Sequence, residues 1–238
     1  MAGTDVSIVT GAGRGIGRSI AVRLAKEGHN LIITSRTERE LRSAKEEIES
    51  FGAECSYFAG DVADPHFVNN TVEEVLKSYG RVDHLINNAG IGIIKKVVDS
   101  KLEEFQRQIN TNLYGIYNFT KAVLPGMIDR RSGSIINISS LAGKNSFVGG
   151  TMYSASKHAV MGFTKSLMLE VREYNIRTVV ICPGSVESSF GRDSSTDPRS
   201  KAQILMPEDV ADVVVAVIKL PVRALMSEID LRPTNPSK

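Results

Sequence analysis

A tyrosine and a lysine stand four positions apart in the stretch TMYSASKHAV. Because four residues are close to one helical turn, a helix here would place Tyr153 and Lys157 on the same face. An ammonium group beside a phenol favours the phenolate, so the pair could act as a general acid whose pKa is lowered. Both side chains would also suit an ordinary solvated helix surface. The spacing alone leaves both interpretations open.

Spaced glycines separate a β-rich run from a helical pattern in the segment SIVTGAGRGIGRSIA. Gly11, Gly15 and Gly17 follow the order G-x-x-x-G-x-G, a variant of the dinucleotide-binding pattern. Glycine permits a tight turn and lets backbone N–H groups approach a pyrophosphate at the positive end of the following helix. A P-loop is excluded because its Gly-Lys-Ser/Thr ending is missing, although the adenosyl site of a methyltransferase could use a similar turn. The segment predicts nucleotide binding.

The second β-rich run ends in ITSRTERE, where the cofactor type is commonly decided. A site for NAD often has Asp or Glu about 20 residues past the glycines, but Ser35 and Arg36 occupy that region here. Arg36 suits a 2′-phosphate, and Arg14 could approach the same phosphate from the other side. These residues predict NADPH rather than NADH. Glu38 or Glu40 could turn inward instead and weaken that preference.

Short β-rich runs alternate with longer helical patterns along the chain, and this alternation predicts that an α/β fold holds these residues in place. Asp61 ends the third run, where it could accept a hydrogen bond from an adenine amino group or cap the next helix. The loop FGRDSSTDPRSKAQILMP, residues 190–207, is either a disordered surface loop or a lid over the ligand crevice. We expect one Rossmann-type domain, residues 1–238, with a doubly wound parallel sheet of seven strands near 6–10, 30–35, 55–60, 82–90, 133–140, 176–184 and 227–231.

Composition excludes several other classes of function. The chain has 238 residues, of which 24% are charged, and a formal net charge of +2, with no dense run of Lys or Arg that would indicate nucleic-acid binding. VVVAVI, the longest strongly apolar stretch, is too short to span a bilayer, and Ala2 stands where N-myristoylation needs glycine, so we expect a cytoplasmic protein without a membrane partner. Cys55 and Cys182 lack metal-ligand spacing, so we expect no disulfide framework and no metal site.

Several motifs follow one another along the chain, and their order resembles the short-chain dehydrogenase/reductase family over nearly the whole chain. These motifs are the glycine loop, GDV, NNAG, ISS, the Tyr/Lys pair and PG. The combination is specific: Thr10-Gly11 opens the loop, Asn87-Asn88-Ala89-Gly90 follows the fourth strand, and Ser140 lies thirteen residues before the tyrosine. The resemblance implies an enzyme that reduces a carbonyl group with NADPH, as the family's 3-oxoacyl carrier-protein reductases do. The alternative within the same fold is an NADPH-binding regulator with little catalysis.

The resemblance also implies a catalytic tetrad of Asn112, Ser140, Tyr153 and Lys157. Tyr153 would protonate the substrate oxygen as hydride arrives, and Lys157 would lower the pKa of the tyrosine and hold the nicotinamide ribose. Ser140 would donate to the substrate oxygen, while Ser139 points the other way. Asn112 would interrupt its long helix, expected over about 102–130, and hold a water that links Lys157 to solvent.

Further site residues follow from the same resemblance. The segment CPGSVESSF would grip the nicotinamide carboxamide, with Ser188 where the family usually has threonine. The mostly apolar substrate pocket would be formed by Ile91, Ile93, Leu141, Phe147 and Phe190, and it would suit an acyl chain, an aromatic ketone or a small diketone. The tail SEIDLRPTNPSK departs from the glycine-rich end of many 3-oxoacyl reductases, which weakens the acyl-thioester assignment. We expect a homotetramer or homodimer that associates through the helices carrying Asn112 and Tyr153. The expected cofactor-binding residues are Gly11, Arg14, Gly15, Ile16, Gly17, Ser35, Arg36, Asp61, Val62, Asn87, Ala89, Gly90, Tyr153, Lys157, Pro183, Gly184, Val186 and Ser188.

Overall fold

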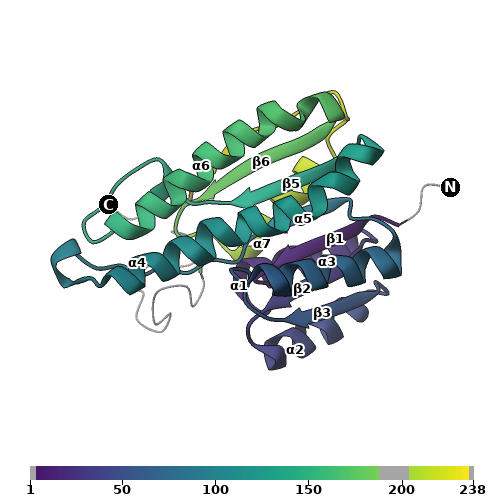
Figure 1. Cartoon of the computed structure of the whole chain (residues 1–238), viewed down its shortest axis with the longest axis horizontal. Coiled ribbons are helices and arrows are strands. Elements are labelled where there is room, and N and C mark those ends of the chain that lie inside the picture. The colour runs from purple at the N-terminus through teal and green to yellow at the C-terminus, as the bar shows by residue number, and fades with distance from the viewer. Residues whose placement is uncertain (1–3, 188–203, 236–238) are drawn as a thin grey trace.

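Seven parallel strands form one sheet with helices on both faces in the computed structural model, which describes residues 4–187 and 204–235 (Figure 1). The strand order is β3-β2-β1-β4-β5-β6-β7, so the direction in which strands are added reverses between β1 and β4. In open α/β sheets, ligands bind beyond the carboxyl ends of the strands at such a reversal. The fold class predicted from the sequence is confirmed. The strands are β1 Val6–Thr10, β2 Asn30–Ser35, β3 Cys55–Ala59, β4 His84–Asn87, β5 Gly133–Ile138, β6 Ile176–Pro183 and β7 Glu228–Leu231.

Successive residues of the central strands enter two different hydrophobic cores, because side chains alternate between the faces of a sheet. Val9 and Ile33 pack with helices α1, α2 and α7 on one face. Ile8 and Ile32 pack with helices α3, α5 and α6 on the other. Burial on both faces explains why the strands read as nearly continuous apolar runs. The helices are α1 Gly15–Lys26, α2 Glu38–Glu49, α3 Pro65–Tyr79, α4 Leu102–Ile109, α5 Gly115–Arg130, α6 Thr151–Val171 and α7 Pro207–Ile218.

The long helix expected over about 102–130 is interrupted between α4 and α5. Residues Asn110–Tyr114 form a π-helical turn, and Asn112 lies within it, buried. Such turns locally widen a helix and often occur at functional sites. The interruption at Asn112 is therefore as expected from the sequence.

Both cysteines, Cys55 and Cys182, are free and buried, as small hydrophobic side chains would be. Burial raises the pKa of the Cys55 thiol to about 12 and that of Cys182 to about 11, so both stay protonated at neutral pH. Within the described part of the chain, no helix is both long and apolar enough to cross a membrane.

Candidate active site

A cavity of about 860 Å³ opens at the carboxyl ends of the strands. Its walls come from the glycine loop after β1 and from the residues that follow β2 to β6, so segments far apart in sequence meet there. Most of the predicted site residues line it: Gly11, Arg14, Gly15, Ile16, Ser35, Arg36, Asp61, Val62, Ala89, Gly90, Ile91, Ser140, Leu141, Phe147, Tyr153, Lys157, Pro183, Gly184 and Val186.

Lys157 reaches the cavity from α6 and is only 4% exposed. Its Nζ donates a hydrogen bond to the Ile138 carbonyl at 3.0 Å and lies 5.9 Å from the centroid of the Tyr153 ring. Burial penalises the ammonium form and lowers the pKa of Lys157 to about 8. The lysine is therefore a desolvated cation, and it lies on the same helix face as the tyrosine, as the spacing of the pair predicts.

Tyr153 departs from the sequence-based expectation in one respect. Burial raises the pKa of its phenol, and a side-chain hydrogen bond with Ser140 offsets only part of this effect. We expected Lys157 to lower this pKa, but the pKa is raised instead, because desolvation outweighs the hydrogen bond with Ser140. A raised pKa keeps the phenol protonated, which is the form a proton donor needs.

Ser140 and Ser139 follow β5 and both line the cavity, but their hydroxyl groups have different partners. The Ser140 Oγ accepts a hydrogen bond from the Ala142 backbone N–H at 3.1 Å on the cavity side. The Ser139 Oγ instead donates to the Lys157 carbonyl at 3.2 Å, which links the end of β5 to α6. Ser139 thus helps to position the helix that carries the tyrosine.

Asn112 braces the site from behind the cavity wall. Its Oδ1 accepts from the Ile91 N–H at 2.8 Å, and its Nδ2 donates to the Ile91 carbonyl at 2.9 Å and to the Ser156 Oγ at 3.0 Å. A methyl group at Gly90 would lie 3.2 Å from the Asn112 Oδ1 and 3.7 Å from the Lys157 Nζ, so these residues converge closely. The side chain of Asn112 fastens the loop after β4 to α6, and its water relay stays a prediction.

The glycine loop is held against the segment after β4. The Thr10 Oγ1 accepts hydrogen bonds from the N–H groups of Asn88 and Ala89, both at 3.0 Å. A Cβ at Gly17 would lie 2.3 Å from the Gly11 carbonyl oxygen, so only glycine lets α1 begin this close to the loop. The side chain of Asn88 completes the contact by donating to the Thr10 carbonyl at 3.0 Å. Gly17 therefore shapes the loop without lining the cavity.

Asn88, and not Asn87 as predicted, faces the cavity. Asn87 points into the protein and donates to the Asn137 Oδ1 at 2.9 Å, whereas Asn88 lines the cavity. Adjacent strand residues face opposite ways, and the sequence did not show which of the two faces the cavity. Ile93 also lies outside the cavity, with its N–H bonded to the Gln108 side chain.

Arginine and glutamate meet at the end of the cavity formed by the glycine loop and the start of α2. Arg14, Ser35, Arg36 and Glu40 all line it, and the Arg14 Nη1 lies 3.9 Å from the Glu40 Oε1. Glu40 has thus turned inward, which the sequence left open. Glu38 instead pairs with Arg42 at 2.7 Å on the surface of α2.

Asp61 lines the cavity and does not cap the next helix, so of the two roles considered for it only the contact with adenine stays a prediction. Its Oδ1 accepts from the Ala63 N–H at 2.9 Å in a local turn, and the residue lines the cavity. The cap of α3 is Asp64, whose Oδ1 accepts from the His66 N–H at 2.9 Å. The cavity also includes residues that the sequence did not single out, among them Gly13, Thr37, Asn145 and Ser146. It is also lined by Ser185 and Glu187 of the segment CPGSVESSF and by Ile204 of the expected lid. Ser188, Phe190 and residues 190–203 of the expected lid lie outside the described residues.

Comparison with known proteins agrees with this geometry. Residues 5–199 match the family model of the short chain dehydrogenases. The chain is 32% identical to a sepiapterin reductase of Chlorobaculum tepidum, over 97% of this chain and 96% of the relative. It is 35% identical to a 3-oxoacyl-(acyl-carrier-protein) reductase of Thermotoga maritima, over 88% of each chain. A solved structure of a variant actinorhodin polyketide ketoreductase with NADPH superposes with a TM-score of 0.90 at 33% identity, covering 98% of both chains.

The chain belongs to the short-chain dehydrogenase/reductase family. It is an oxidoreductase of the class that interconverts alcohols and carbonyl compounds.

Proposed function

We propose that the protein is an NADPH-dependent reductase that converts a ketone to an alcohol, with Tyr153 as the general acid. One observation carries the proposal: Ser140, Tyr153 and Lys157 meet at one part of a cavity whose other end has two arginines. A hydride donor with a 2′-phosphate fits a cavity of this kind. The glycine loop before α1 suits the pyrophosphate of such a donor, and Arg14 with Arg36 suits its 2′-phosphate.

In this mechanism the Ser140 hydroxyl and the Tyr153 hydroxyl hold the substrate oxygen by hydrogen bonds. Bound NADPH supplies the hydride to the carbonyl carbon. Tyr153 gives its proton to the oxygen on which negative charge develops, and its raised pKa keeps that proton in place beforehand. Lys157 is protonated below about pH 8 and stabilises the phenolate that remains. Asn112 and Ser139 keep the loop after β4 and helix α6 in position.

The preference for NADPH rests on Arg14 and Arg36, and Glu40 acts against it. A charge-assisted hydrogen bond contributes about 1.5–3 kcal/mol, so Arg36→Ala should lower the ratio of kcat/KM for NADPH over NADH about tenfold or more. Arg42→Ala is a matched control, since Arg42 lies on α2, which begins two residues after Arg36, is exposed and pairs with Glu38. Equal use of both coenzymes by the native enzyme would contradict the assignment.

The substrate is a ketone whose carbon skeleton is mostly apolar near the reacting group. Ile91, Leu141 and Phe147 line this part of the cavity. A 3-oxoacyl thioester and a small diketone both have this chemistry, and a relative named 3-oxoacyl-(acyl-carrier-protein) reductase matches the chain. NADPH oxidation with a panel of 3-oxoacyl thioesters, aromatic ketones and diketones tests the proposal. If the protein binds NADPH tightly but NADPH is oxidised with no member of the panel, the protein is a regulator instead.

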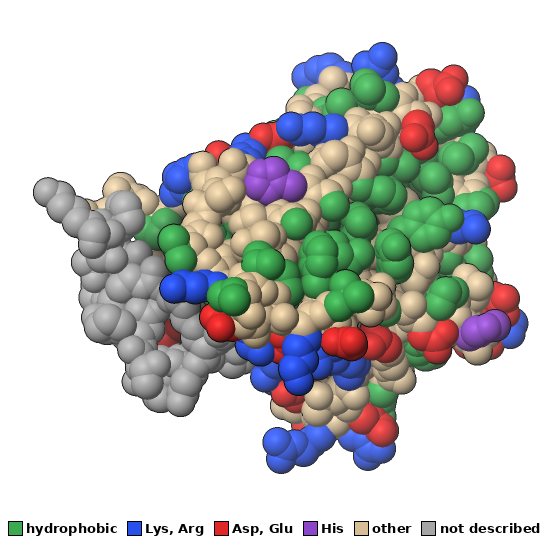
Figure 2. All heavy atoms as spheres, turned by 60° about the vertical axis from the view of Figure 1, so that its left-hand side comes forward, with side chains coloured by type: hydrophobic (Ala, Val, Ile, Leu, Met, Phe, Trp, Pro, Cys, Tyr) green, Lys and Arg blue, Asp and Glu red, His purple; other side chains and the backbone are tan. Residues whose placement is uncertain are grey.

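A homotetramer or homodimer is the proposed assembly, in the cytoplasm. Hydrophobic side chains gather on one face of the molecule (Figure 2), and a hollow of about 470 Å³ there is lined from α5 and α6 by Tyr117, Ala159 and Phe163. Tyr114 and Tyr117, which line this hollow, are 53% and 47% exposed, so they offer contiguous apolar surface that a second copy of the chain would cover. Light scattering at micromolar concentration would reveal a monomer if this proposal is wrong.

A further inference from the structure

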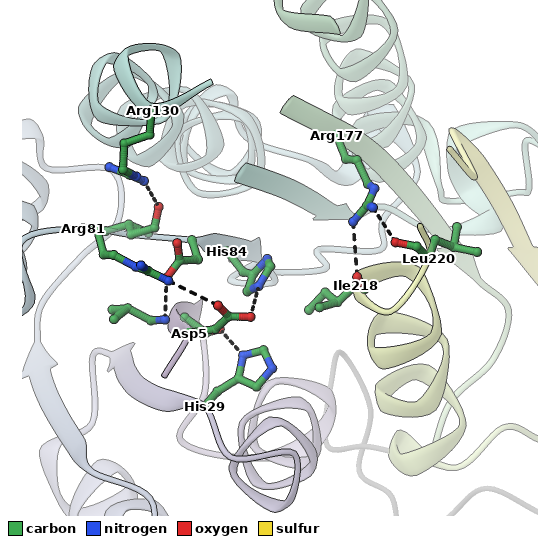
Figure 3. Close-up of polar contacts among 12 residues, drawn as sticks. Asp5, His29, Arg81, His84, Arg130, Arg177, Ile218 and Leu220 are labelled. Carbon is green, nitrogen blue, oxygen red and sulfur yellow. Dashed lines mark hydrogen bonds and ion pairs between the residues drawn. The ribbon is translucent and has the colours of Figure 1, made fainter. Parts of the chain in front are cut away.

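Two histidines and an aspartate lie together at the edge of the sheet opposite to the active-site cavity (Figure 3). Asp5 comes directly before β1, His29 directly before β2, and His84 begins β4. β1 lies between β2 and β4, with Val6 beside Asn30 and Ser7 beside His84, so the amino ends of the three strands meet. One possible ligand atom from each of the three side chains lies within 4.8 Å of the others.

We propose that Asp5, His29 and His84 bind a divalent transition metal ion, with Zn²⁺ as the best fit. Imidazole nitrogens and a carboxylate oxygen are ligands that Zn²⁺ accepts, and three protein ligands with a water complete its tetrahedral shell. Such a site would join the starts of three strands. It is independent of the catalytic assignment, because no residue of the cluster lines the active-site cavity.

The distance between the ligand atoms of His84 and Asp5 is close to the distance expected between two ligands in a tetrahedral site. The His84 Nε2 lies 3.3 Å from the Asp5 Oδ2. That distance is long for a charge-assisted hydrogen bond of about 2.7–2.9 Å. Metal–ligand bonds of about 2.0–2.1 Å in tetrahedral geometry place the ligand atoms about 3.4 Å apart. A Zn²⁺ ion therefore fits between these two atoms with little movement.

All three ligand atoms lie close to the spacing that an ion requires. Their separations do not exceed 4.8 Å, which is at most about 1.4 Å more than the tetrahedral spacing. Asp5 lies outside regular structure and its side chain is 45% exposed, so its carboxylate can adjust toward an ion held by the imidazoles. The same exposure gives an ion a route to two histidines that are only 7% and 8% exposed.

Neighbouring groups orient two of the three ligands. The Ser7 Oγ lies 2.8 Å from the His29 Nδ1, which fixes the orientation of that ring. The Arg81 Nη2 lies 3.4 Å from the Asp5 Oδ1, which leaves the Oδ2 directed toward His84 (Figure 3). Contacts of this kind, around the ligands themselves, typically hold metal sites in shape.

The local charge favours a cation. The Arg81 guanidinium is shared between Asp5 and Asp83, whose Oδ2 lies 2.8 Å from the Arg81 Nε. Two carboxylates around one guanidinium leave a net negative charge when both imidazoles are neutral. A divalent cation between these carboxylates and the two imidazoles would balance this negative charge.

Metal titration of the protein without a polyhistidine tag, after treatment with a chelator, tests the proposal. We expect one Co²⁺ per chain, with the intense visible absorption of a tetrahedral site that Zn²⁺ then abolishes by displacement. Zn²⁺ should also raise the melting temperature by about 3 °C or more. His84→Leu and Asp5→Asn should each weaken Co²⁺ binding at least tenfold while leaving NADPH binding unchanged.

The chain offers a matched control, because it has four histidines and the other two, His66 and His158, are exposed. His66→Gln with His158→Gln should bind Co²⁺ as the native protein does. The proposal is overturned if Co²⁺ gives no stoichiometric tetrahedral spectrum, if binding is unchanged in Asp5→Asn and His84→Leu, or if it is lost in this control. Asp5→Asn changes a half-exposed side chain, so it keeps the test valid even if His84→Leu does not fold.

Discussion

Replacing Lys157 by methionine should make the cofactor-free protein more stable while it removes activity. Lys157 is a buried cation, and burial lowers its pKa from an ordinary value of 10.5 to about 8. Each pKa unit corresponds to about 1.36 kcal/mol, so holding the charge inside costs the folded state about 3 kcal/mol at pH 7. Lys157→Met removes this cost but also loses the hydrogen bond to the Ile138 carbonyl, which contributes about 1 kcal/mol. The free energy of unfolding should therefore rise by about 2 kcal/mol.

The stability difference between the native protein and Lys157→Met should depend on pH in a definite direction. The folded-state pKa of Lys157 is below the unfolded one, so the unfolded chain holds the proton longer as pH rises above about 8. The native protein thus recovers stability between about pH 8 and 10.5, whereas Lys157→Met has no such recovery. The advantage of the variant should be complete at pH 7 and fall by about 2 kcal/mol by pH 9.5.

Urea unfolding of both proteins without cofactor, at pH 7 and about pH 9.5, measures this difference. Lys165→Met is the control, because Lys165 lies on the same helix but its side chain is 60% exposed and pairs with Glu228. That change should alter the free energy of unfolding by no more than about 1 kcal/mol at either pH. If Lys157→Met is less stable than the native protein at pH 7, or its advantage does not shrink with pH, the reasoning about the buried charge is refuted.

Three further outcomes are expected. Tyr153→Phe keeps the ring but removes the donated proton, so kcat should fall about 10²–10⁴-fold while the Kd for NADPH is retained, and turnover above about a tenth of native would exclude the general-acid role. Gly17→Ala brings a Cβ to 2.3 Å from the Gly11 carbonyl oxygen and should abolish tight NADPH binding in a fluorescence titration, whereas Gly162→Ala in α6, with nothing within 4 Å, should leave it unchanged. Tyr117→Glu puts a charge on the apolar face and should shift the light-scattering mass to that of a monomer without loss of fold; an unchanged oligomer would place the interface elsewhere.

The local sequence was sufficient to predict the fold and most of the candidate site. Alternating short apolar runs and helical periodicity depend on neighbouring residues alone, so the seven strands could be placed from them. The motifs around Gly11, Ser140, Tyr153 and Lys157 end at strand or helix boundaries, and parallel strands bring those boundaries to one edge. For that reason these residues could be assigned to one cavity before their positions in space were known.

Tertiary structure decided what depends on burial and on the order of strands. The pKa of Tyr153 rises because the folded chain removes its phenol from water, an effect that the spacing to Lys157 does not reveal. Asn88 rather than Asn87 faces the cavity because the packing of β4 selects one of two alternating directions. His29 and His84 meet Asp5 only because β1 is placed between β2 and β4. Local patterns are encoded along the chain, whereas solvent exclusion and strand order arise only when distant segments pack together.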